Sequence, residues 1–66
     1  MKNRVKELRK NQKLTQEELA NLIGISRQAI NAIKKEKFDP SLPTAFKMSK
    51  LFEIAIEELF LYEGST

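Results

Sequence analysis

The chain has 66 residues, which suffices for one small hydrophobic core but not for two conventional domains. It contains neither cysteine nor histidine, which excludes disulfides and thiolate zinc ligands and removes the most common general base. Residues 1–40 carry ten Lys or Arg against five Asp or Glu, whereas residues 41–66 carry two against four. This asymmetry favours a polyanionic partner at the basic front and a protein contact at the rear.

The first apolar residues predict a short helix. Val5 and Leu8 lie three residues apart among charged residues, which is helical spacing, and Asn3 is a suitable N-cap. We expect this helix to cover residues 4–12.

A capping box predicts the start of the second helix. The Thr15 hydroxyl can accept from the backbone of Glu18 while the Glu18 carboxylate reaches back. Gly24 ends the helix, because glycine adopts the left-handed conformation most easily. The predicted apolar face consists of Leu19, Ala20, Leu22 and Ile23.

A tight turn leads into the third helix. Ile25 is predicted to plug this turn, and Ser26 is a strong N-cap for a helix that continues to about Lys35. The predicted inward face is Ala29, Ile30 and Ile33, which leaves an outward set of Arg27, Gln28, Asn31, Lys34 and Lys35.

The rear of the chain predicts two more helices. Ser41 can cap a fourth helix, because Pro43 falls in its first turn, where a missing N–H costs nothing. A short fifth helix is expected from Ile56 to Phe60, followed by a short extended piece at Leu61 and Tyr62. The predicted buried stripe of the fourth helix is Leu42, Ala45, Phe46, Met48 and Phe52. The predicted fold class is all-α, a compact five-helix domain over residues 1–66.

Residues 16–35 have the layout of a helix-turn-helix, two short helices joined by a tight turn, which presents the second helix to a DNA major groove. The segment TQEELANLIGISRQAINAIKKEKFDPSL, residues 15–42, resembles the phage-repressor and Cro type of regulator, called the Xre family. The resemblance covers nearly the whole chain and implies a repressor-like protein that binds palindromic operators as a dimer.

The resemblance also assigns roles to individual residues. It implies that Gln16 binds a phosphate and that Ser26, Arg27, Gln28 and Asn31 face the groove. The chemistry agrees, because Arg suits guanine O6/N7 and Gln or Asn suits adenine N6/N7. Lys34, Lys35 and Lys37 are predicted phosphate contacts, with Lys10 and Lys13 as weaker candidates that serve equally well as solubility charges.

Three residues depart from the family pattern. Glu36 stands where Gly or Asn is common, and a left-handed backbone there costs roughly 1 kcal/mol or more, so we expect a distorted or extended helix exit. Lys34 replaces a common acidic residue, which adds phosphate attraction. Ala55 replaces the usual Ser or Thr cap of the fifth helix.

A homodimer is predicted because one recognition helix contacts only a few base pairs. The predicted interface residues are Ile56, Leu59, Phe60, Leu61 and Tyr62. For Leu59 and Phe60 an alternative stays open, in which they close the core of the monomer.

The sequence thus predicts a sequence-specific regulator of transcription that binds double-stranded DNA, with no catalytic site, metal, cofactor or small-molecule ligand. The alternative is an antitoxin-like interaction module whose DNA binding serves autoregulation, since such proteins share this domain. Membrane-surface binding by the C-terminal helix is disfavoured, because that segment is acidic. Without an apolar stretch after Met1 or a spanning segment, we expect a cytoplasmic location.

Overall fold

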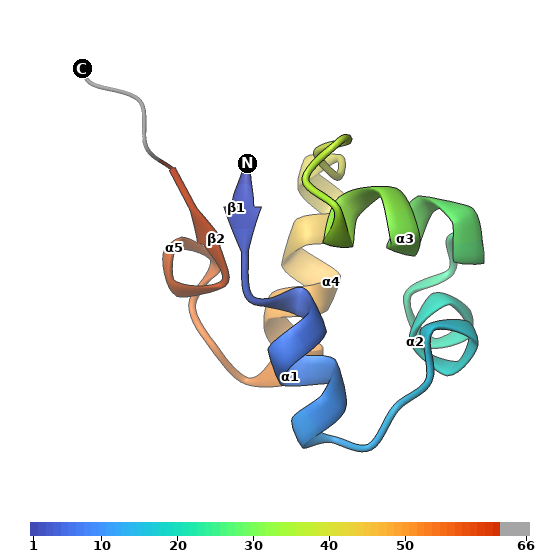
Figure 1. The fold of residues 1–66 in the computed structure, drawn as a ribbon. Coiled ribbons are helices and arrows are strands. Elements are labelled where there is room, and N and C mark those ends of the chain that lie inside the picture. The colour runs from blue at the N-terminus through green and yellow to red at the C-terminus, as the bar shows by residue number, and fades with distance from the viewer. Residues whose placement is uncertain (63–66) are drawn as a thin grey trace.

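The computed structural model describes residues 1–62, and residues 63–66 lie outside the described part. The described chain folds into five short helices and two very short strands, which confirms the predicted all-helical, five-helix architecture (Figure 1). The elements are β1 (Lys2–Asn3), α1 (Val5–Asn11), α2 (Gln16–Ile23), α3 (Arg27–Lys34), α4 (Leu42–Phe52), α5 (Ile56–Leu59) and β2 (Phe60–Leu61). No helix in residues 1–62 is long and apolar enough to cross a membrane.

The helix starts follow the predicted capping chemistry. The Thr15 hydroxyl accepts a hydrogen bond from the Glu18 backbone N–H at 3.0 Å, and the Glu18 carboxylate accepts from the Thr15 N–H at 2.8 Å. Ser26 caps α3 by accepting from the Ala29 N–H at 3.0 Å. Each bond satisfies a backbone donor that the first turn of a helix leaves without a partner. The capping box and the serine cap are therefore confirmed.

The exit of α3 is left-handed rather than extended. Glu36 has φ = 62°, its N–H donates to the Ile33 carbonyl, and the Lys37 N–H donates to the Ala32 carbonyl, both at 3.0 Å. This pair of bonds is a Schellman motif, in which glycine is the usual left-handed residue. These two hydrogen bonds thus hold Glu36 in a backbone conformation that is unfavourable for any residue with a Cβ.

The core gathers side chains from all five helices. Buried apolar side chains project inward from each helix, and α2 and α3 contact each other along the helix-turn-helix. No polar or charged residue is buried among residues 1–62. The fully buried set is Val5, Leu19, Ile30, Ile33, Met48 and Leu59. The domain is therefore stabilised by one apolar cluster.

Three predicted core positions are wrong. Leu22 on α2 is 60% exposed, because α3 and α4 contact the other side of α2. Leu42 and Phe46 on α4 are 66% and 51% exposed. The short helices α2 and α5 cover only a narrow side of α4, so its buried face is reduced to three residues, Ala45, Met48 and Phe52.

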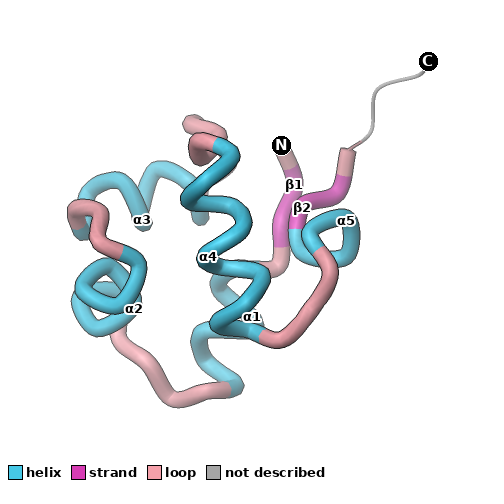
Figure 2. Tube along the Cα trace, turned by 180° about the vertical axis from the view of Figure 1, so that it is seen from behind, coloured by secondary structure: helices cyan, strands magenta, loops and turns pink. Residues whose placement is uncertain are grey.

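The two strands form a small antiparallel sheet that the sequence did not predict as a pair. Lys2 lies opposite Leu61 and Asn3 opposite Phe60, so the N-terminal strand lies beside the last strand (Figure 2). The predicted fifth helix therefore ends at Leu59, one residue early. Seen from behind, α4 runs between this sheet and the α2–α3 pair (Figure 2).

The predicted cap of α1 is replaced by a different arrangement. Arg4 occupies the cap position without a side-chain cap bond. The Asn3 side chain still accepts from the Val5 N–H at 3.1 Å, and its amide donates to the Ile33 carbonyl at 2.8 Å. Asn3 thus supports the start of α1 and ties it to the end of α3.

Candidate nucleic-acid interface

The third helix is held by its buried side and leaves its polar side open. Ile30 and Ile33 are 0% and 1% exposed, whereas Arg27 and Gln28 in the first turn are exposed and Asn31 is half-buried. Residues that share a face of a helix repeat every three or four positions, so apolar anchoring on one side fixes the direction of the other. Of the predicted inward set, Ile30 and Ile33 are buried but Ala29 is only half-buried, as are Asn31 and Lys34 of the predicted outward set.

Four of the predicted contact residues lie around one hollow. Gln16, at the start of α2, joins Arg27, Gln28 and Asn31 of α3 around a depression of about 310 Å³. The helix-turn-helix brings them together because the Gly24 turn, with φ = 85°, folds α2 and α3 against each other. Ser26 is exposed beside them, with its hydroxyl oxygen engaged as the cap of α3.

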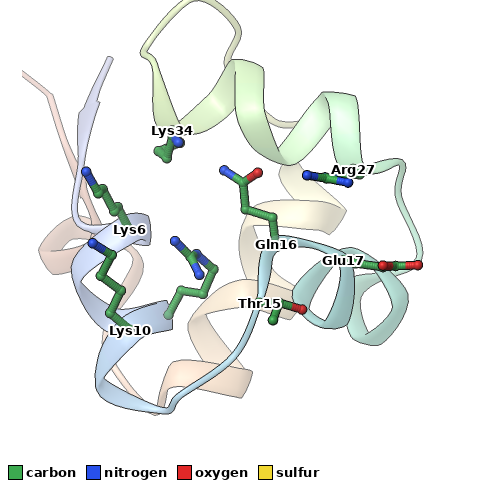
Figure 3. Close-up of a pocket in the computed structure, with 8 residues that line it drawn as sticks. Lys6, Lys10, Thr15, Gln16, Glu17, Arg27 and Lys34 are labelled. Carbon is green, nitrogen blue, oxygen red and sulfur yellow. The ribbon is translucent and has the colours of Figure 1, made fainter.

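A larger hollow adjoins the first one and is strongly basic. It measures about 570 Å³, and Gln16 and Arg27 line it as well as the first hollow, so the two hollows adjoin at these residues and are together called the groove. Figure 3 shows Lys6 and Lys10 projecting from α1, Lys34 from α3, and Gln16 between them and Arg27. The remaining residues that line the larger hollow are Arg9, Thr15 and Glu17.

Sequence reasoning missed two residues of this hollow, Lys6 and Arg9, and ranked Lys10 as a weak candidate. One signal was available, because Lys6 lies three residues before Arg9 and four before Lys10, the two spacings that place side chains on one side of a helix. That α1 presents this side to α3 follows from the tertiary packing of the two helices.

Positive charge is concentrated enough in this hollow to affect ionisation. The pKa of Lys34 lies below its ordinary value, first because partial burial desolvates the ammonium group and then because Lys6, Lys35, Arg9 and Lys10 repel it. An anion at this point would relieve the repulsion. The groove is therefore electrostatically suited to a polyanion.

The other predicted phosphate contacts lie apart from this groove. Lys35 and Lys37 are exposed at the far end of α3 and line neither hollow, and the same holds for Lys13 after α1. Among the predicted phosphate-binding residues, Gln16, Lys34 and the weaker candidate Lys10 thus line the groove, whereas Lys35, Lys37 and the weaker candidate Lys13 lie outside it.

The rear of the molecule divides the predicted dimer residues into two groups. Leu59 and Phe60 are 0% and 7% exposed, because they fill the core of a single chain, which is the alternative that the sequence left open for them. Leu61 and Tyr62 are 40% and 71% exposed, and Ile56 is half-buried. Ala55 precedes α5 without a side-chain cap bond, as its residue type predicts.

Within residues 1–62, no group of three His, Cys, Asp or Glu side chains is placed to hold a metal ion. The chemistry that the described groove offers is hydrogen bonding and charge, from amides, guanidinium groups and ammonium groups.

Comparison with known proteins agrees with this geometry. A family model described as Helix-turn-helix matches residues 5–59. The chain is 54% identical over 63 residues to the uncharacterized HTH-type transcriptional regulator MJ0272 of Methanocaldococcus jannaschii, with 96% of each chain covered. It is 35% identical over 57 residues to the cryptic phage CTXphi transcriptional repressor RstR of Vibrio cholerae, which covers 86% of this chain and 51% of RstR.

A solved structure shows the same fold. The restriction-modification controller protein C.AhdI from Aeromonas hydrophila is 33% identical, with a TM-score of 0.76 and 86% of both chains covered. Since the family model runs from α1 to α5 and includes the whole motif, this chain belongs to the helix-turn-helix family of DNA-binding transcription regulators, in its phage-repressor and Cro-like form.

Proposed function

We propose that this regulator is a cytoplasmic repressor that binds a palindromic operator as a homodimer and reads bases with the start of α3. The observation that carries the proposal is the shared hollow in which polar side chains of α3 stand around Gln16, while Ile30 and Ile33 anchor the helix from below. A rigid helix with long polar side chains on its open face fits a major groove.

The proposed base contacts come from the first two turns of α3. Arg27 offers a bidentate donor pair for guanine, and Gln28 and Asn31 offer one donor and one acceptor each for adenine. Ser26 can still donate its hydroxyl proton, because its oxygen serves the helix cap as an acceptor. These four residues supply the direct readout in this proposal.

The proposed backbone contacts flank the base-reading residues. Gln16 lies beside Arg27 at the start of α2, and Lys34 lies on the other side of the same groove. Lys35 and Lys37 extend the positive charge beyond the groove at the exit of α3. Lysines that neutralise phosphates release counterions and make affinity depend on salt, whereas the neutral Gln16 amide orients the protein without that effect.

The dimer interface is proposed for the rear, through Ile56, Leu61 and Tyr62, with Leu59 and Phe60 left to the monomer core. Two recognition helices must lie about 34 Å apart to enter successive major grooves on one side of the duplex. A two-fold contact at the rear, away from the DNA-facing side chains, leaves both helices accessible.

Selection of bound sequences from a random DNA library tests the proposal as a whole. We expect a palindromic site whose half-sites are separated by about one helical turn. An enriched site without two-fold symmetry would contradict the dimer, and a library with no enriched sequence would contradict sequence-specific binding.

The dimer has its own test in Leu61→Glu. The Leu61 side chain is partly exposed and β2 is held by backbone pairing, so the variant should fold as a helical monomer with sharply weaker operator binding. Leu22→Glu is the matched control, because Leu22 is an exposed apolar residue on another part of the surface. Analytical ultracentrifugation at micromolar concentration measures both variants, and a wild-type chain that sediments as a 7.6 kDa monomer would refute the dimer.

A further inference from the structure

The basic hollow between α1 and α3 contains an arginine that is only partly satisfied. The Arg9 Nη1 atom donates to the Leu14 carbonyl at 2.6 Å. Its Nε atom is buried and makes no hydrogen bond within residues 1–62. A buried donor without a partner is uncommon and destabilising, so the hydrogen bonds of the chain leave this guanidinium group only partly satisfied.

The cations around Arg9 have no compensating carboxylate. Among residues 1–62, no ion pair involves Lys6, Lys10, Lys34 or Arg9. Glu17 lines the hollow, but Figure 3 shows its carboxylate pointing away from the lysines. Like charges from two helices thus face one open space, which is costly unless an anion enters it.

We infer that this hollow is a phosphate site, in which Lys6, Arg9 and Lys34 hold one phosphate group of the DNA backbone and in which occupancy stabilises the folded protein. The inference rests on the proposed DNA binding for its natural ligand. The site itself is independent of that proposal, because inorganic phosphate presents the same oxygens and charge.

Phosphate fits the donors better than a carboxylate or a base does. Guanidinium groups bind phosphate oxygens through parallel hydrogen bonds, and lysine ammonium groups add point charges. Thr15 and Gln16, at the N-terminal end of α2, line the same hollow, so the positive end of that helix dipole adds to the field. The pKa of Lys34 is lowered because desolvation and then the neighbouring cations disfavour its charged form, and a bound anion would oppose both effects.

Lys34 lines the hollow from a different helix than the other two proposed ligands. It comes from α3, near the end of the recognition helix, while Lys6 and Arg9 come from α1. A phosphate between them joins the helices, so the bound DNA backbone fixes the orientation of α3. The site therefore couples backbone binding to the position of the base-reading side chains.

Thermal unfolding in sodium phosphate and in sodium chloride, at equal ionic strength and pH, tests the site without DNA. Phosphate should raise the Tm of the wild-type protein by roughly 4–8 °C at concentrations well above its dissociation constant. In an NMR titration with inorganic phosphate, the Arg9 Nε resonance should move. An equal Tm in both salts, or an Arg9 resonance that does not respond, would overturn the inference.

Lys34→Glu is the decisive variant, because it places a carboxylate opposite Arg9 and should not unfold the protein. It should lose the phosphate-dependent rise in Tm. Lys47→Glu has the same charge change on α4, away from the hollow, and should keep the rise. If Lys34→Glu keeps the rise, the site is wrongly placed.

Binding to DNA identifies the source of the phosphate. Lys34→Glu should weaken operator binding by at least about tenfold and lower the slope of log affinity against log salt by about one. Operator affinity equal to that of the wild type would overturn the assignment to DNA. A wild-type chain that responds to inorganic phosphate but enriches no DNA sequence would refute the proposed function while supporting the anion site.

Discussion

The face formed by α1, α2 and α3 and the face formed by α4, α5 and β2 share one core but differ in the side chains that they expose. The first face presents arginine, lysine and amide groups around the groove. The second presents Leu42, Phe46, Leu61 and Tyr62, each at least 40% exposed. Large apolar side chains exposed at a surface are typical of protein contacts when they form a patch, whereas a cationic groove is typical of nucleic-acid contacts.

The two faces also differ in how their side chains are positioned. The polar residues of α3 are fixed by buried neighbours on the same helix, such as Ile30. Leu61 and Tyr62 follow a one-turn helix, and the two-residue pairing of β2 with β1 includes Leu61 but not Tyr62. The groove is therefore preorganised for its ligand, while the rear gains order if a second chain covers it.

The largest expected effect on stability comes from a substitution in the core that the two faces share. Ile30→Ala should lower the free energy of unfolding by about 2–5 kcal/mol, because it leaves a cavity under the recognition helix. Urea denaturation measures the change, and Leu22→Ala, an exposed position, should stay within about 0.5 kcal/mol of the wild type. Normal stability in Ile30→Ala would show that α3 is not anchored as described.

Arg27→Ala tests the role of the groove in DNA binding without disturbing the core. Arg27 is exposed, so stability should hardly change, while binding to the selected operator should weaken by about 1–3 kcal/mol with relaxed preference at one base pair. Competition between operator variants measures both effects. Equal weakening on every sequence would instead identify Arg27 as a phosphate contact.

Thr15→Ala removes the N-cap of α2, the helix whose first residue is Gln16 of the groove. Loss of the hydroxyl acceptor should destabilise the protein by about 1 kcal/mol, whereas Thr15→Ser keeps the cap and should lose much less. Chemical denaturation measures both variants. If Thr15→Ala is as stable as the wild type, the capping box contributes nothing to α2.

The smallest expected effect is a pH dependence at the same cap. The Thr15 backbone N–H, followed by its hydroxyl, holds the pKa of Glu18 below the ordinary value of 4.5. The stabilisation is therefore present above pH 4.5 and is lost as pH falls through the lower pKa of the folded state. Glu18→Gln keeps an acceptor but does not titrate, so its difference from wild type in free energy of unfolding should change below pH 4.5 and stay constant above it.

The sequence by itself determined the five helices, the N-caps of α2, α3 and α4 and the order of the motif. Thr15 with Glu18, Gly24, Ser26 and Ser41 each act through hydrogen bonds or backbone angles within a few residues, so their spacing is sufficient to predict them. The polar face of α3 followed in the same way, because helical periodicity separates it from Ile30 and Ile33.

Only the tertiary structure decided which residues distant along the chain meet. The β1–β2 pairing is too short to show strand alternation, and the burial of Leu59 and Phe60 depends on how α5 closes the core. The meeting of Lys6 and Arg9 with Lys34 depends on the packing of α1 beside α3. Local patterns specify hydrogen bonds between near neighbours, whereas burial and charge clustering depend on contacts between helices far apart in sequence.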